Sequence, residues 1–142
     1  MKALLALTAF IAVAANASPL TVAASYRNDK VVNNEGVEVS AQYNTNSLAF
    51  GANIMANENK VLSYGATVGV PTKLVGIQVT PFMGVEQYRT SKEFTAVNLG
   101  TKVVVPVYKT LGLTTDVKWV QGTGSKNDLS DVSYSVGIAN KF

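Results

Sequence analysis

The chain has neither cysteine nor histidine among its 142 residues. Without cysteine there is no disulfide to hold the fold, and without histidine the commonest proton shuttle and metal ligand is missing. Charged side chains are also scarce: they make up 15% of the sequence, whereas soluble domains average about 25%. The net charge of +3 is mild and dispersed, and no basic stripe or aromatic RNA-binding motif accompanies it, which excludes nucleic acid as a partner.

The N-terminus has the pattern of a secretory signal peptide. Lys2 precedes an uncharged run over residues 3–15, and the small-residue site Ala15-Asn16-Ala17 follows. The apolar run is too short for a transmembrane helix, which needs about 20 apolar residues. We predict cleavage after Ala17, so that residues 1–17 are the signal peptide and residues 18–142 form one domain.

Clusters of Asn, Asp, Gly, Pro and Lys divide that domain into eight segments of alternating polarity. Their length of about ten residues is what a tilted membrane-spanning strand requires. The predicted strands cover residues 19–28, 35–44, 47–56, 61–70, 75–88, 93–105, 109–121 and 131–142. Pro81 lies inside the fifth strand and lacks an N–H for the ladder, so we expect a bulge there.

Each predicted strand has one apolar face and one face of small polar residues. In residues 35–44, for example, Val37 and Tyr43 share one face, whereas Ser40 lies on the other. A soluble lipocalin-like barrel would turn its apolar face inward and cover its outside with charge, whereas a membrane barrel turns that face to lipid. The scarcity of charge favours an all-β, eight-stranded, antiparallel, up-and-down transmembrane barrel.

The order of the strands predicts a topology in which both termini lie in the periplasm. External loops then fall near residues 29–34, 57–60, 89–92 and 122–130, and periplasmic turns near 45–46, 71–74 and 106–108. Aromatic residues of the lipid face gather near both ends of the strands, as interfacial girdles do. They are Tyr26, Tyr64, Trp119 and Tyr134 at the external end, and Tyr43, Tyr108 and Phe142 at the periplasmic end.

The final segment, DVSYSVGIANKF, alternates up to Phe142, and TPFMGVEQY precedes it as a Pro- and Gly-spaced strand. With the signal peptide and the eight strands, the chain resembles the small eight-stranded bacterial outer-membrane barrels, which include the X-type surface proteins and the membrane domain of outer-membrane protein A. The resemblance implies export to the outer membrane of a Gram-negative cell as a monomer. It also implies that the barrel-assembly machinery reads Phe142 as a signal, and that membrane lipid and lipopolysaccharide surround the barrel.

Several barrels of this size are enzymes that act on lipid A through a histidine and a serine, or proteases that use aspartate and histidine. This chain has no histidine, and no lysine–serine pair stands in as nucleophile and base. Asp128 and Asp131 are interpreted as parts of a solvated turn rather than as metal ligands. We therefore predict no enzyme, no cofactor and no metal.

Six charged residues share the inward face by alternation: Arg27, Glu38, Glu86, Lys102, Asp116 and Lys118. Because an isolated charge in a narrow interior is costly, we expect them to pair, with a diagonal contact between Lys102 and Asp116. Such a network either fills the lumen structurally or gates a narrow pore for small ions; the structural role is preferred, because an eight-stranded lumen seldom conducts well.

Any surface function must reside in the external loops, which are short. The longest loop contains Lys126, which could touch lipopolysaccharide, although a solvated hairpin tip is the preferred reading. The preferred function is a non-catalytic integral outer-membrane barrel with a structural or surface-interaction role. A secreted soluble barrel that carries an apolar ligand and a narrow ion-conducting pore remain the alternatives.

Overall fold

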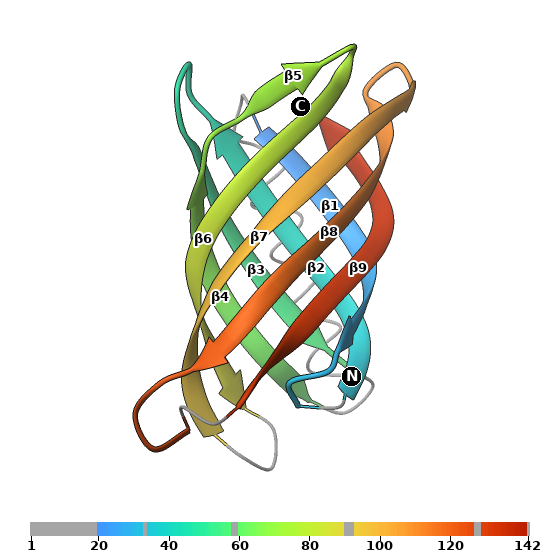
Figure 1. Cartoon of the computed structure of the whole chain (residues 1–142). Coiled ribbons are helices and arrows are strands. Elements are labelled where there is room, and N and C mark those ends of the chain that lie inside the picture. Colours follow the sequence, from blue (N-terminus) through green and yellow to red (C-terminus); the bar gives the residue numbers. More distant parts are fainter. Residues whose placement is uncertain (1–19, 33, 58–59, 90–92, 127–128, 142) are drawn as a thin grey trace.

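Antiparallel strands form nearly all of the described chain (Figure 1). The computed structural model describes residues 20–32, 34–57, 60–89, 93–126 and 129–141. The strands are β1 (Leu20–Asp29), β2 (Asn34–Asn44), β3 (Ala49–Ala56), β4 (Val61–Gly69), β5 (Thr72–Leu74), β6 (Ile77–Arg89), β7 (Glu93–Tyr108), β8 (Leu111–Gly122) and β9 (Ser130–Lys141), with a 3₁₀ turn, η1 (Gly124–Lys126), before β9. No described helix is long and apolar enough to cross a membrane.

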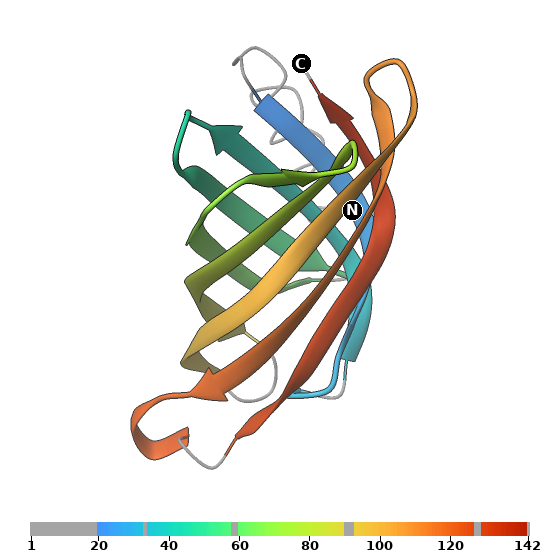
Figure 2. The ribbon, with the colours of Figure 1, turned by 45° about the horizontal axis from the view of Figure 1, so that its top comes forward.

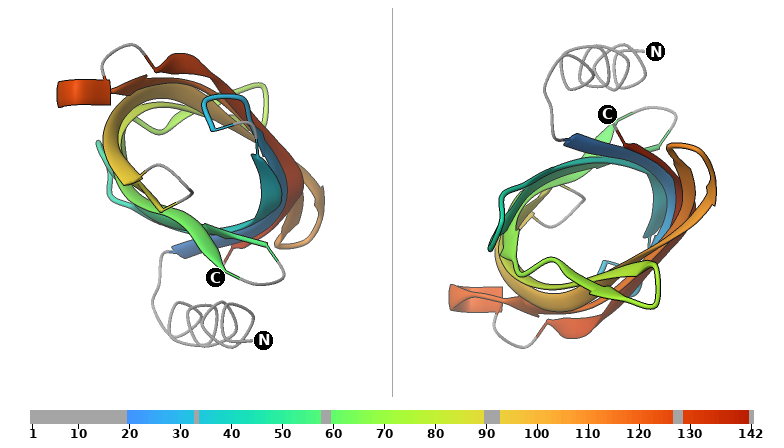
Figure 3. Two further views of the ribbon diagram at one scale, coloured as in Figure 1. Left: turned by 90° about the horizontal axis from the view of Figure 1, so that it is seen from below. Right: turned by 90° about the horizontal axis from the view of Figure 1, so that it is seen from above.

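The strands close into a ring, which both end-on views in Figure 3 show. Each long strand pairs with its neighbours in the sequence, β1 also pairs with β9, and β4 pairs with β6. Closure leaves no long strand with an unpaired edge. The short β5 continues the path of β4 along β6, so the predicted eight-stranded, antiparallel, up-and-down barrel is confirmed.

The gap between β4 and β5 contains Pro71 and faces Pro81 of β6, and neither proline has an N–H for the ladder. The predicted bulge at Pro81 is wrong. Gly69 lies opposite Phe82 and Thr72 lies opposite Val79, so β4 and β5 keep one register along β6. Pro81 accepts a hydrogen bond from the Val70 N–H at 3.0 Å, but it has no N–H to return one. The hydrogen bond that Pro81 cannot donate is therefore the one toward Val70, just after β4. On its other side, the pairing of β6 with β7 continues through Pro81 without a change of register.

The hairpin between β5 and β6 turns at two residues with positive φ. Val75 has φ of 53° and Gly76 has φ of 80°, as the mirror-image turns of tight hairpins require. Glycine suits this conformation, whereas a β-branched valine is strained in it. The predicted periplasmic turn at residues 71–74 is thus displaced to 75–76, and the turn predicted at 106–108 is displaced beyond β7, where Lys109 also has positive φ.

The barrel has two distinct ends. We call the end where β1 begins and β9 finishes the terminal end, at the top of Figure 1, and the end where β1, β3, β6 and β8 finish the loop end. Figure 2 shows the terminal end tilted forward, with the β5–β6 hairpin crossing it.

The polarity of the barrel wall is opposite to that of a soluble protein: polar side chains face the interior and apolar side chains face outward. Buried residues include many polar and charged side chains, such as Ser25, Glu86 and Lys118, whereas Phe50, Met83 and Leu99 are exposed on the outer face. The predicted signal peptide and Phe142 lie outside the described residues.

Candidate functional site

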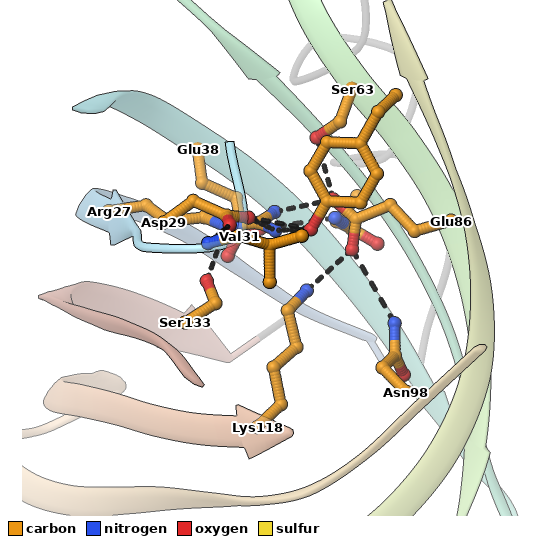
Figure 4. A network of polar contacts seen from close by, with 11 residues as sticks. Arg27, Asp29, Val31, Glu38, Ser63, Glu86, Asn98, Lys118 and Ser133 are labelled. Atoms are coloured by element: carbon orange, nitrogen blue, oxygen red, sulfur yellow. Dashed lines mark hydrogen bonds and ion pairs between the residues drawn. The ribbon is translucent and has the colours of Figure 1, made fainter. Parts of the chain in front are cut away.

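Arg27 is the centre of a buried ionic network inside the barrel, near its loop end (Figure 4). Its Nη1 lies 2.7 Å from both Glu38 Oε2 and Glu86 Oε2. Its Nη2 donates to Asp29 Oδ2 at 2.5 Å and to the Tyr88 hydroxyl at 3.0 Å. Its Nε donates to Ser133 Oγ at 2.8 Å. Every nitrogen of this fully buried guanidinium therefore has a partner, as a buried cation requires.

Glu86 extends the network across the lumen toward β8. Its Oε1 accepts from Lys118 Nζ at 2.7 Å and from Asn98 Nδ2 at 3.4 Å, while its Oε2 accepts from Ser63 Oγ at 2.6 Å. Because Arg27 and Lys118 both contact this carboxylate, Glu86 joins the two cations into one network.

Glycine allows close approach of backbone and amides beside this network. An added Cβ at Gly84 would lie 2.3 Å from the Ala66 carbonyl oxygen and 3.1 Å from Asn98 Oδ1. At Gly65 it would lie 2.6 Å from the Val85 carbonyl oxygen and 3.1 Å from Asn53 Oδ1. Asn53 in turn donates to Glu38 at 3.0 Å. Glycine is therefore needed at both positions, first for the neighbouring strand and then for the amide side chains.

A hydrophobic cluster closes the lumen beyond the ionic network. Tyr88 and Phe94 stack with ring centroids 4.8 Å apart and an interplanar angle of 9°. Ala96 and Val120 pack with them, and Val31, Val32 and Leu129 cover the cluster. We call these residues the loop-end plug.

Lys102 and Asp116 lie deeper in the lumen, but the predicted ion pair between them is wrong. They are directly opposite on β7 and β8 rather than diagonal. Lys102 Nζ instead donates to Ser40 Oγ at 3.2 Å, and no ion pair within the described chain joins Lys102 to Asp116. Both line a cavity of about 30 Å³ together with Glu38 and Asn53, which has room for about one water molecule.

The six predicted interfacial aromatics within the described residues lie on the outer face of the wall. Tyr26, Tyr43, Tyr64, Tyr108, Trp119 and Tyr134 are between 42% and 64% exposed. Tyr26, Tyr64, Trp119 and Tyr134 belong to the loop-end halves of their strands, and Tyr43 and Tyr108 to the terminal-end halves. The Tyr26 hydroxyl also donates to Glu35 on the neighbouring strand. Apolar residues such as Met83, Leu99 and Val136 occupy the wall between the two groups. We call this zone the apolar belt.

Comparison with known proteins supports the fold. The fold is an eight-stranded β-barrel. A structure of the Yersinia pestis outer membrane protein Ail in a phospholipid bilayer nanodisc has a TM-score of 0.58 and 10% identity, covering 87% of this chain and 98% of that one. The crystal structure of Ail, the attachment invasion locus protein of Yersinia pestis, has a TM-score of 0.51 and 13% identity, covering 87% and 96%. No family profile and no curated protein matches the chain.

The structure thus joins four of the six predicted lumen charges in one network of ion pairs, namely Arg27, Glu38, Glu86 and Lys118. Lys102 and Asp116 are not ion-paired to it, although both share a small cavity with Glu38. The sequence reasoning missed Asp29, which it assigned to an external loop, and Tyr88, which shares the inward face of β6 with Glu86. Alternation along β6 was the signal that could have found Tyr88.

The contacts of this arrangement are ion pairs and hydrogen bonds within the barrel interior. The carboxylates around Arg27 are each neutralised by a cation or hydrogen-bonded, and no described group of three or more metal-ligating side chains could hold a metal ion. A network whose charged groups are all bonded to other members of the network favours a single arrangement of the side chains in the interior.

Proposed function

We propose that this chain is a non-catalytic integral β-barrel of the outer membrane of a Gram-negative cell, with short surface loops and a structural or surface-interaction role. The observation that carries the proposal is the reversed polarity of the wall. The outer face exposes an apolar belt flanked by aromatics, while charges in the middle of the strands, such as Glu86 and Lys118, are buried inside the barrel. Monomeric soluble proteins rarely expose an apolar patch larger than a few hundred Å², whereas lipid is the solvent that such a belt requires.

The state of the lumen argues against the two alternatives. A carrier of an apolar ligand needs an apolar cavity, but the cavities of the mid-lumen have volumes of about 30 and 10 Å³. An ion-conducting pore needs an open path, but the Arg27 network and the loop-end plug occupy the lumen one behind the other. A filled lumen favours the structural role of the charges.

The partners proposed for the barrel follow from its apolar outer belt and from the charges at its loop end. The belt would contact membrane lipid, and the lysines and arginines of the loop end, such as Lys60 and Arg89, would face the phosphates of lipopolysaccharide. The barrel-assembly machinery would recognise the last strand through Phe142. A monomer suffices, because ring closure pairs the long strands within one chain.

The test is electrophoretic mobility after refolding into detergent, with and without boiling. A closed barrel resists cold detergent because its hydrogen bonds run around the ring, so we expect two mobilities. A variant that lacks residues 130–142 loses the strand joining β1 to β8 and should show one mobility. A single mobility for the parent chain, or full solubility of the mature chain without detergent, would contradict the proposal. High conductance in planar bilayers would favour the pore.

A further inference from the structure

The inner face at the terminal end carries lysines that face the mouth of the barrel. Lys73 lies opposite Gln78 in the β5–β6 hairpin, and Lys141 lies opposite Thr21 on the neighbouring strands β9 and β1. Both lysines line a cavity of about 460 Å³ at this end. Both also line, with Lys109, a second cavity of about 200 Å³. We call this pair of cavities the terminal mouth.

No carboxylate balances these lysines within the described lining of the terminal mouth. The carboxylates of the interior lie elsewhere: Asp29, Glu38 and Glu86 surround Arg27 near the loop end, and Asp116 lies in the middle layer. None of the ion pairs formed within the described chain includes Lys73 or Lys141. The terminal mouth is therefore positively charged, whereas the Arg27 network near the loop end holds three carboxylates.

Gln78 gives the terminal mouth a polar group without a protein partner. The residue is 7% exposed and lines both cavities. Its side chain takes part in none of the hydrogen bonds formed within the described chain, and its amide atoms are not among the buried atoms that lack a partner, so the amide is open to the cavities. Ala23, Val104 and Ala139 pack together next to it, and with Gln78 they line a further cavity of only about 10 Å³. The mouth thus presents two inward cations and one available amide above a nearly filled lumen.

We propose that the terminal mouth binds a phosphate-bearing ligand. A phosphate group carries between one and two negative charges and three strong acceptor oxygens, which matches two ammonium groups and an amide N–H. Lys73 and Lys141 would neutralise the phosphate, and the Gln78 amide N–H would donate to it. The volume of the larger cavity is within the range of small-molecule sites. The ligand is either a soluble phosphate compound or the headgroup of an anionic phospholipid; only the second source rests on the proposed membrane location.

The test is a titration of the isotope-labelled full barrel in phosphatidylcholine nanodiscs with inorganic phosphate, read by NMR shifts of the Lys73 and Gln78 amides. The second arm replaces part of the phosphatidylcholine with phosphatidylglycerol. Saturable shifts at the mouth with phosphate identify a soluble source. Shifts that occur only with phosphatidylglycerol identify the lipid headgroup. Absence of saturable shifts in both arms overturns the proposal.

Matched variants separate a site from general charge attraction. The double variant K73Q/K141Q should bind at least about tenfold more weakly, and the Gln78→Leu variant should bind several-fold more weakly. The control K30Q/K60Q removes the same charge from the loop end and should leave binding unchanged. An equal loss in the control overturns the proposal. The boiling-dependent gel mobility of each sample reports whether the barrel is folded, so a failed barrel is distinguished from a failed site.

Discussion

Replacement of Arg27 by methionine should destabilise the barrel more than replacement of any one of its carboxylate partners. The contacts of Arg27 and Lys118 set two positive charges against the three negative charges of Asp29, Glu38 and Glu86. Arg27→Met leaves one positive charge against three buried negative charges and removes five donor contacts. Removing one partner of a buried ion pair costs about 3 to 5 kcal/mol, and we expect the upper part of this range.

The change Glu38→Gln has the opposite effect on the charge balance. It leaves two positive against two negative charges, and the amide oxygen can still accept from Arg27 and Asn53. We expect a loss of about 1 kcal/mol in the parent background. In the Arg27→Met background Glu86 keeps Lys118, and the same change removes one of the two carboxylates left without a cation, so it should stabilise the barrel. The effect of Glu38→Gln on the free energy of unfolding thus changes sign between the two backgrounds. Independent contacts would give the same effect in both, so the change of sign tests whether the charges act as a network.

The assay is equilibrium urea unfolding in detergent micelles, followed by the fluorescence of Trp119, the single tryptophan. Arg89→Met is the matched control, because its pair with Glu93 is 3.9 Å long with side chains 58% and 68% exposed. Exposed pairs of this kind contribute at most about 1 kcal/mol. The reasoning is refuted if Arg27→Met costs no more than Arg89→Met, or if Glu38→Gln destabilises both backgrounds equally.

Three further perturbations test the turn, the apolar belt and the last residue. Val75→Asn should raise stability by about 1 kcal/mol in the same urea assay, because asparagine tolerates the positive φ of this turn better than valine does; a lower urea midpoint would contradict the turn geometry. Leu99→Arg, at a side chain 62% exposed in the middle of the belt, should cost about 2 to 4 kcal/mol in bilayers. Its control Leu74→Arg, at a side chain 56% exposed near the terminal end, should cost at most about 1 kcal/mol, and equal losses would place the belt elsewhere. Deletion of Phe142 should reduce the amount of assembled barrel in cells far more than refolding in detergent, and normal surface levels would contradict its role as an assembly signal.

The two faces of the barrel could be derived from the sequence because they are encoded locally. Side chains alternate across a strand at every residue, so the inward position of Glu86 and the outward position of Leu99 follow from parity alone. Errors of one or two residues at strand ends leave that parity unchanged. The aromatic groups at the two ends followed in the same way.

The contacts inside the lumen depended on the tertiary structure. Arg27 meets Glu86 only because β1 and β6 lie across the barrel from each other, a relation set by ring closure and by the registers of every intervening pair. Asp29 joined the network because β1 extends one residue further than its sequence pattern indicated. Lys102 reaches Ser40 instead of Asp116, because a long flexible side chain bonds across the narrow lumen to an acceptor on β2.

The sequence by itself therefore determined the strand number, the faces and the reversed polarity, since these depend on period-two patterns within each strand. The tertiary structure decided which charges pair, how the two prolines are accommodated, and that Lys73, Gln78 and Lys141 meet at one mouth. Lys73 and Gln78 meet locally across the β5–β6 hairpin, but Lys141 is far from both in the chain, and only the closed ring brings it to the same mouth.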